Sequence, residues 1–401
     1  MEYEDYGVDA GENDWALEHA RELLTRVPLI DGHNDLPWTL RGYGDGRRAV
    51  EELPIATALD TDTDIPRLRA GHVAAQVWSV WVPITVTEGF VNVQLEQIDI
   101  AHRMIEAHPE SFRLALTAAD IEQAFDDGKI ASLIGLEGGH VLANSLGVLR
   151  SFYRLGARYL TLTHNLTLDW VDSAMDEARN DGLSDFGKEA VREMNRLGMM
   201  VDLSHVSEKA MHDVLDVTEA PIIFSHSSAK ALTDHPRNVP DAVMRRVAEN
   251  GGIVMITFIP GFVSAAVKEW EEPLREALKS TPSAEEYESK RKAYALEHPE
   301  PKATLFDVAD HIEHARAVAG IDHIGIGSDF WGSGNMPVGL EDVSRFPYLF
   351  AELIRRRWSD DELELLAGRN FLRVMRSVEA VGARIRRERK PSTALIDRLS
   401  G

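Results

Sequence analysis

The chain has 401 residues, 44% of them hydrophobic, and its 66 acidic side chains against 43 basic ones give a net charge of −23. This acidic balance argues against nucleic acid as a partner, because binding to phosphates needs a basic surface. Cysteine is absent, which excludes disulfides and restricts any metal site to histidine and carboxylate ligands.

The sequence shows no sign of a membrane segment. No apolar run reaches the ~20 residues that a membrane span needs. The first residues, Met1 to Tyr6, are acidic and lack the basic and apolar regions of a signal peptide. We therefore expect a cytoplasmic protein with no membrane attachment.

Eight short apolar runs alternate with charged, amphipathic stretches. Most of these runs lack a polar and apolar alternation, which is typical of parallel strands buried on both faces. Eight strands separated by helices predict an α/β fold, the (β/α)8 or TIM barrel. In chain order, the expected strands are 27–31, 74–82, 130–136, 157–163, 199–203, 221–224, 252–258 and 323–327.

Three of the intervening stretches carry clear helix signals. Residues 187–197 and 207–217 have apolar residues at three-to-four spacing, and Ser184 and Ser207 mark their starts. Residues 241–250 are followed by two glycines, which predicts a helix that ends at a glycine.

Two segments depart from the alternation of strands and helices. Residues 261–304 are long and charged, and they predict a helical insertion after the seventh strand, near the mouth of the barrel. The sequence is equally consistent with a solvent-exposed addition to the barrel and with a lid over its mouth. The tail 341–401 is helical by pattern and is expected to pack outside the barrel. Because no low-complexity linker interrupts the chain, we interpret residues 1–401 as a single domain.

Acidic and histidine side chains follow six of the expected strands, at the point where each strand ends. Because the strands of a parallel barrel end around one mouth, these side chains are expected to meet there. Taken singly, each has an ordinary explanation, as a hydrogen-bonded histidine or as an aspartate in a cap or turn. One barrel explains all of them together. They are His33 and Asp35 after the first strand, Glu137 after the third, His164 after the fourth, His205 after the fifth, His226 after the sixth and Asp329 after the eighth.

The number of candidate ligands predicts two metal ions. Three histidines and two carboxylates exceed the about three protein ligands of one catalytic zinc ion. Glu137 is the natural bridge, because its carboxylate has two oxygens, and two ions about 3.5–4 Å apart would activate a shared hydroxide. This chemistry indicates a metal-dependent hydrolase. Motifs of other hydrolases and of nucleotide-binding proteins, such as G-x-S-x-G and the phosphate-binding loop, are absent from the sequence.

The same motifs resemble those of the membrane dipeptidase family, also called renal or microsomal dipeptidases, which are binuclear zinc peptidases on an amidohydrolase-type barrel. The likeness extends from about residue 29 to about residue 370, and the H-x-D pair separates this family from relatives that begin with H-x-H. The matching stretches are IDGHNDLP at 30–37, GLEGG at 135–139, LTHN at 162–165, DLSH at 202–205, FSHS at 224–227, HPRN at 235–238 and GSDF at 327–330.

This resemblance implies how the five metal ligands are divided. His33 and Asp35 would bind one zinc ion, His205 and His226 would bind the other, and Glu137 would bridge the two. Animal members of the family carry signal peptides, disulfides and a lipid anchor, and we carry none of these over to this chain.

The resemblance also implies three groups that act on the substrate. His164 would polarise the scissile carbonyl and hold the developing oxyanion, and Asp329 would shuttle a proton beside the bridging hydroxide. Arg237 would pair with the terminal carboxylate of the substrate, a task that suits a planar bidentate donor. Without the family, Arg237 is as readily interpreted as a surface charge.

The expected function is a zinc-dependent dipeptidase with two Zn²⁺, acting on dipeptides with a free C-terminal carboxylate, L-D dipeptides included; a homodimer is possible. One alternative is another amidohydrolase activity on small carboxylate substrates, such as deacylation or lactam opening. A second is a barrel that binds a metal or ligand without catalysis. Asp329 discriminates against the second alternative, because a pure binding site needs no proton shuttle.

Overall fold

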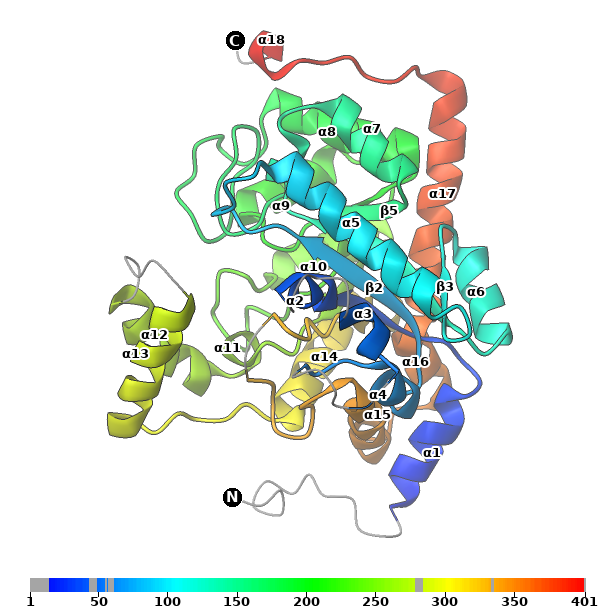
Figure 1. The fold of residues 1–401 in the computed structure, drawn as a ribbon, viewed down its shortest axis with the longest axis vertical. Coiled ribbons are helices and arrows are strands. Elements are labelled where there is room, and N and C mark those ends of the chain that lie inside the picture. The colour runs from blue at the N-terminus through cyan, green and yellow to red at the C-terminus, as the bar shows by residue number, and fades with distance from the viewer. Residues whose placement is uncertain are drawn as a thin grey trace.

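Eight parallel strands close into a barrel with helices around it in the computed structural model of the chain (Figure 1). The pairings of β2 with β4 and of β1 with β9 complete the ring, which confirms the predicted (β/α)8 fold. The barrel strands are β1 (Leu29–Asn34), β2 (Val73–Trp81), β4 (Ile130–Glu137), β5 (Ala157–Thr161), β6 (Met200–Asp202), β7 (Ile223–Phe224), β8 (Ile253–Ile256) and β9 (Ile324–Ile326). The structure describes residues 14–42, 49–54, 56, 61–277, 284–332 and 335–399.

Each expected strand overlaps one strand of this barrel, and one further strand was missed. Every residue of β1 and of β4 is buried, which explains why their sequences do not alternate. The missed strand, β3 (Phe112–Leu114), pairs with residues 130–132 of β4, ahead of the part of β4 that pairs with β5. Only Phe112 of its three residues is buried, so β3 leaves no apolar run in the sequence.

The helices expected from the sequence are confirmed. The hydroxyls of Ser184 and Ser207 accept hydrogen bonds from the backbone amides of Gly187 and Ala210, and these caps begin α8 and α9. Gly251 ends α10 with a φ of 78°, a left-handed conformation that glycine adopts without a steric penalty.

The remaining helices fill the connections between the strands and the tail. Short turns of 3-10 helix at Gly139–Leu142, Ile321–His323 and Val343–Arg345 and a π turn at Leu365–Arg369 accompany them. The helices are α1 (Trp15–Leu24), α2 (Leu36–Gly42), α3 (Ala49–Glu52), α4 (Ile65–Ala70), α5 (Phe90–Ala107), α6 (Ala118–Asp126), α7 (Leu146–Arg154), α8 (Asp185–Leu197), α9 (Glu208–Val217), α10 (Asp241–Asn250), α11 (Pro260–Val263), α12 (Ala265–Ala277), α13 (Ala284–Glu297), α14 (Leu305–Ala319), α15 (Phe346–Arg355), α16 (Asp360–Glu364), α17 (Asn370–Glu388) and α18 (Ile396–Leu399).

Helices also occupy the two segments that depart from the alternation. α11, α12 and α13 lie between β8 and α14, where the helical insertion 261–304 was expected, and Figure 1 shows α12 and α13 at one side of the barrel. In the tail, α15 packs on α1 and α17 packs on α8, in the outer layer of helices. The extent of a single domain over 1–401 stays a prediction.

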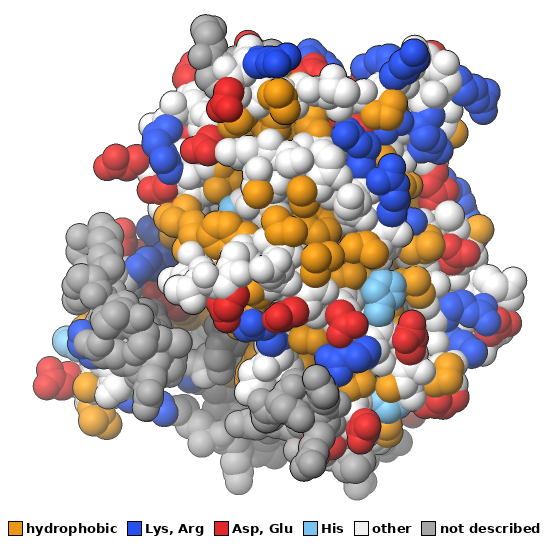
Figure 2. Space-filling model, turned by 45° about the horizontal axis from the view of Figure 1, so that its top comes forward, with side chains coloured by type: hydrophobic (Ala, Val, Ile, Leu, Met, Phe, Trp, Pro, Cys, Tyr) orange, Lys and Arg blue, Asp and Glu red, His pale blue; other side chains and the backbone are white. Residues whose placement is uncertain are grey.

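The surface carries the charge of the chain in a mixed pattern. Figure 2 shows acidic and basic side chains interspersed over one face, with a band of hydrophobic side chains across its middle. Within the described ranges, none of the helices combines the length and the apolar character that a membrane crossing requires.

Candidate metal centre and active site

The seven acidic and histidine residues predicted for the site meet at the carboxyl ends of the barrel strands. His33 lies near the end of β1 and Glu137 is the last residue of β4, while the other five follow the ends of their strands by one to three residues. Groupings that could hold a metal ion bring all seven together, as His33, Glu137 and His226; Glu137, His164 and His205; and His33, Asp35 and Asp329.

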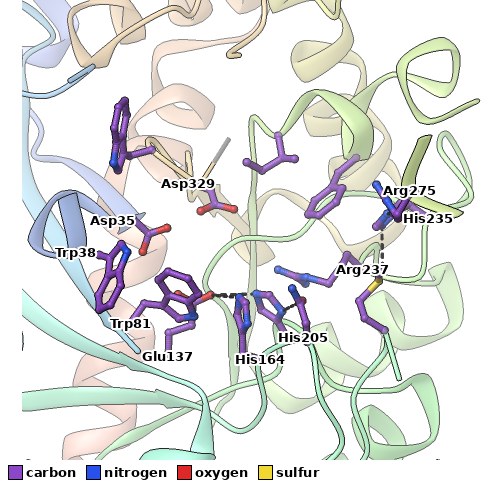
Figure 3. Close-up of a pocket in the computed structure, with 16 residues that line it drawn as sticks. Asp35, Trp38, Trp81, Glu137, His164, His205, His235, Arg237, Arg275 and Asp329 are labelled. Atoms are coloured by element: carbon purple, nitrogen blue, oxygen red, sulfur yellow. Dashed lines mark hydrogen bonds and ion pairs between the residues drawn. The ribbon is translucent and has the colours of Figure 1, made fainter. Parts of the chain in front are cut away.

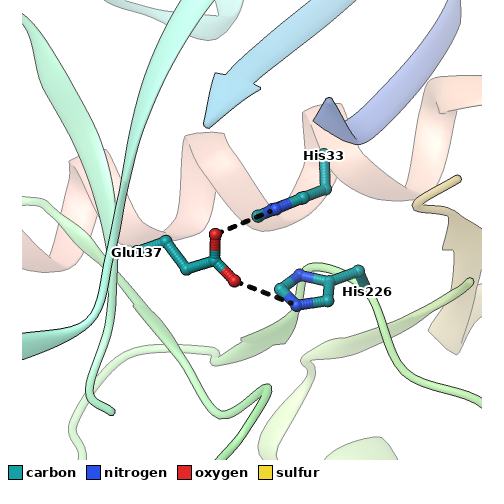
Figure 4. Close-up of side chains that lie close together, drawn as sticks. All are labelled: His33, Glu137 and His226. Atoms are coloured by element: carbon teal, nitrogen blue, oxygen red, sulfur yellow. Dashed lines mark ion pairs between the residues drawn. The ribbon is translucent and has the colours of Figure 1, made fainter. Parts of the chain in front are cut away.

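The two carboxylate oxygens of Glu137 face different partners (Figure 4). Its Oε2 atom lies 3.4 Å from Nε2 of His33 and accepts a hydrogen bond from the Ser79 hydroxyl at 3.0 Å. Its Oε1 atom lies 3.0 Å from Nε2 of His205 and 3.6 Å from Nε2 of His226. One carboxylate therefore separates a half-site at His33 from a half-site at His205 and His226.

The His33 half-site contains buried polar atoms that lack a hydrogen-bond partner among the described residues. Nε2 of His33 lies 3.5 Å from Oδ1 of Asp35 and 3.8 Å from Oδ1 of Asp329. Nε2 of His33 and Oδ1 of Asp35 are buried without a hydrogen bond to any described residue. Buried polar atoms are rarely left unpaired, and a divalent ion would use both lone pairs. The donor set of nitrogen and oxygen atoms therefore fits zinc.

In each of the three histidines predicted as metal ligands, the Nδ1 atom forms a hydrogen bond with another residue and the Nε2 atom is directed at the cluster. This arrangement selects the tautomer whose Nε2 lone pair is available to a metal ion. The partners are the Tyr159 hydroxyl for His33 at 2.8 Å, Oδ1 of Asn165 for His205 at 3.1 Å and the Ser225 hydroxyl for His226 at 2.8 Å.

These outer partners were missed in the sequence, for two different reasons. Ser225 and Asn165 directly precede or follow a candidate histidine, but adjacency alone assigns them no role. Ser225 in turn donates to Asp202 at 2.6 Å, which leaves its oxygen lone pairs to accept from His226. Tyr159 lies on β5 and reaches His33 across Gly135, where an added Cβ would lie 2.1 Å from the tyrosine ring. No sequence pattern marks that contact.

Two of the site residues have left-handed backbone conformations. φ is 73° at His205 and 64° at Asp329, a region that side chains other than glycine rarely adopt. The Asp329 amide donates to the carbonyl oxygen of His33 at 3.1 Å, so the ends of β9 and β1 are tied together next to the metal cluster. Strain of this kind is typical of residues held for a function.

The negative charges of the buried carboxylates in the cluster favour the binding of a cation. Burial raises the pKa of Asp329 well above its ordinary value, and the charges of Asp35 and Glu137 raise it further. Burial also opposes ionisation of Glu137, but His33 and His205 hold its pKa well below the usual range. Divalent ions would relieve the repulsion among these three carboxylates.

A cavity of about 580 Å³ opens over the cluster. Figure 3 shows Arg237 and Arg275 toward one end, and Trp38, Trp81 and Glu137 toward the other. The described residues thus place the candidate metal ligands and two aromatic rings at one end of the cavity and two cations at the other.

Arg237 is a buried cation with only neutral partners among the described residues. The residue is 2% exposed, and its guanidinium lies 3.4 Å from the Ser227 hydroxyl and 3.4 Å from the carbonyl oxygen of His226. Burial lowers its pKa to about 10, and nearby Asp329 and Glu137 counter that shift, so it is charged at neutral pH. A surface role for Arg237 is therefore wrong.

His164 lies between the cluster and the cavity. Its Nε2 atom is 3.8 Å from Oε1 of Glu137, and its ring lies 5.3 Å from the ring of Trp81. Burial lowers the pKa of His164 to about 4, so the imidazole is neutral at pH 7 and can donate one hydrogen bond. At this distance from Glu137, His164 is able to act as a metal ligand as well as a substrate-binding group.

Comparisons with known proteins identify a matching family and similar structures. A family described as membrane dipeptidase (peptidase family M19) matches residues 17–389. The probable dipeptidase PvdM from Pseudomonas aeruginosa is 26% identical, with 91% of this chain and 99% of that chain covered and a TM-score of 0.79. An amidohydrolase from the same organism is 25% identical, with 90% and 98% covered and a TM-score of 0.68.

A third structure shares the fold. The metallo peptidase from Rhodobacter sphaeroides, liganded with a phosphinate mimic of the dipeptide L-Ala-D-Ala, is 24% identical, with 88% of this chain and 99% of that chain covered and a TM-score of 0.72.

Proposed function

The chain belongs to the membrane dipeptidase family, peptidase family M19, and is a metallo-dipeptidase, and from this premise we propose that it uses two zinc ions bridged by Glu137 to cleave dipeptides with a free C-terminal carboxylate. The observation that carries the proposal is the division of Glu137, whose two oxygens face separate sets of histidines. His33 and Asp35 would hold one ion, and His205 and His226 the other.

The ions would supply the Lewis acidity that activates water at neutral pH. Oδ1 of Asp329, beside His33, would take the proton released there and deliver it to the leaving amine. An amine leaves poorly unless it is protonated, so this transfer is needed for turnover. The raised pKa of the Asp329 carboxyl favours a group that can hold a proton.

Two further residues would position the substrate. His164 is neutral and lines the cavity beside Glu137, so it would donate a hydrogen bond to the oxygen of the scissile carbonyl. Arg237 would pair with the terminal carboxylate, which supplies the charged acceptor that its neutral partners lack. The span between Arg237 and Glu137 then limits the substrate to one residue after the cut.

A substrate panel on the zinc-loaded protein tests this proposal. We expect hydrolysis of L-L and L-D dipeptides and poor cleavage of the same dipeptides with an amidated C-terminus. N-acyl amino acids and lactams serve as the comparison, because they report deacylase or lactam-hydrolase activity. Equal rates on free and amidated dipeptides would contradict the role of Arg237. A cytoplasmic location and a homodimer stay predictions from the sequence.

A further inference from the structure

A second arginine reaches the cavity from the helices that follow β8. Among the described residues of α12 and α13, Arg275 alone lines the cavity. Its Nη1 atom lies 2.9 Å from Nε2 of His235, and its Nη2 atom pairs with Glu271, one turn earlier on α12, at 2.9 Å. The side chain is 39% exposed, so Arg275 stands at the rim, whereas Arg237 lies deep in the cavity.

The two arginines border the same end of the cavity. The ring of His235 stacks on Phe262 at 4.4 Å, and the guanidinium of Arg237 lies over the same phenylalanine at 5.3 Å. The backbone amide of Arg237 also donates to Nδ1 of His235 at 3.1 Å. One imidazole therefore separates the backbone of Arg237 from the guanidinium of Arg275 (Figure 3).

This end of the cavity has more donors than acceptors. Both ring nitrogens of His235 face an N–H group, one from Arg237 and one from Arg275. Burial, together with Arg275 and Arg237, lowers the pKa of His235 to about 2, so its ring is neutral and has a single lone pair. Among the described residues, one of the two donors therefore lacks an acceptor, and an anionic group on a bound substrate would supply it.

The geometry points to a dipeptide whose C-terminal residue has an acidic side chain, with Arg275 as the residue that selects it. This inference rests on the proposed function, in which Arg237 takes the terminal carboxylate. The side chain of the C-terminal residue branches from the carbon that bears that carboxylate, so it lies at the same end of the cavity. An aspartate or glutamate side chain there would pair with Arg275, whereas asparagine or glutamine would leave the charge unmatched.

Glu271 orients Arg275 and also competes for it. Glu271 does not line the cavity, and the two contacts of Arg275 engage two of the five N–H groups of a guanidinium. Gly261 makes room for Glu271, because an added Cβ there would lie 2.6 Å from its carboxylate. A partly exposed arginine that already has a carboxylate neighbour should give a preference of about five- to tenfold.

The test compares kcat/KM for Ala-Asp and Ala-Asn, two substrates of the same shape that differ in charge. We expect the wild type to prefer Ala-Asp by about five- to tenfold and Arg275→Met to bring the ratio close to one. Lys268→Met is the matched control. Lys268 lies on the same helix, pairs with Glu272 and is not part of the cavity wall, so its loss changes the net charge equally but should keep the ratio.

A second variant changes the ratio in the opposite direction. Glu271→Gln keeps the shape of the side chain and removes the competing charge, so the preference for Ala-Asp should rise. A ratio near one in the wild type, an equal loss in Arg275→Met and Lys268→Met, or an unchanged or lower ratio in Glu271→Gln would overturn the role of Arg275. Failure of the zinc-loaded wild type to cleave any of Ala-Ala, Ala-Asn and Ala-Asp would instead contradict the proposed function itself.

Discussion

The two ends of the cavity are built in different ways. At the metal end, every proposed ligand is buried and lies at or just past the end of a barrel strand, and each of the three histidines is held by an outer partner. At the cationic end, Arg237 comes from a loop after β7 and Arg275 from α12, outside the barrel. The difference indicates that the barrel supplies the chemistry and that its loops and added helices supply the choice of substrate. Changes at the metal end should affect all substrates, and changes at the cationic end should alter their ranking.

The largest effect is expected at Glu137, because both half-sites use it. Glu137→Gln should weaken both metal ions and lower kcat/KM by about 10³-fold or more on every dipeptide, since metal chemistry supplies several kcal/mol. His33→Ala should mainly empty one site. Metal content measured on both purified variants distinguishes these results. Equal and mild losses of metal from the two variants would argue against a bridge.

Asp329 should separate chemistry from metal binding. Asp329→Asn keeps the shape of the side chain but removes the oxygen that titrates, so we expect kcat to fall by ~10²–10⁴-fold while both metals are retained. Kinetics and metal analysis on the same sample test this expectation. If one metal is lost, Asp329 is a ligand, and if turnover is normal but the melting temperature falls, it is a structural residue.

Arg237 tests the cationic end directly. Loss of a buried, charge-assisted pair typically costs ~2–5 kcal/mol, so Arg237→Ala should lower kcat/KM on free dipeptides by well over tenfold. The same variant should have little effect on C-terminally amidated dipeptides, which lack the carboxylate. A uniform loss on both kinds of substrate would assign Arg237 a structural role.

The outer partners should produce the smallest effects, confined to one half-site each. Tyr159→Phe removes the hydroxyl bonded to His33 and should weaken the zinc ion at His33 by ~10–100-fold. Ser225→Ala is the matched variant for His226 in the other half-site. Zinc titration should show one weakened and one unchanged site in each variant. If both sites weaken together in either variant, the half-sites are not independent.

The sequence predicted the metal end better than the cationic end, for a physical reason. Strands buried on both faces appear as continuous apolar runs in the sequence. The residues that follow these strands lie together at the mouth of the barrel, so His33, Glu137 and His205 could be placed near one another without a structure. β3 was not predicted from the sequence because two of its three residues are only half buried.

Contacts that depend on packing could not be predicted in this way. Tyr159 reaches His33 only because Gly135 on β4 leaves room for the tyrosine ring. Arg275 lies in a charged helical segment whose sequence resembles any solvated helix. Its place at the cavity depends on how that segment folds back on the barrel, which no local pattern encodes.

In the proposed site, the carboxylate of Glu137 bridges two ions. Anomalous scattering from crystals of the zinc-loaded protein tests this bridge most directly. We predict two zinc peaks about 3.5–4 Å apart, with one Glu137 oxygen on each and with His33 and Asp35 on one ion and His205 and His226 on the other. A single zinc peak in the fully active protein, or two peaks with Glu137 bound to only one of them, would contradict it.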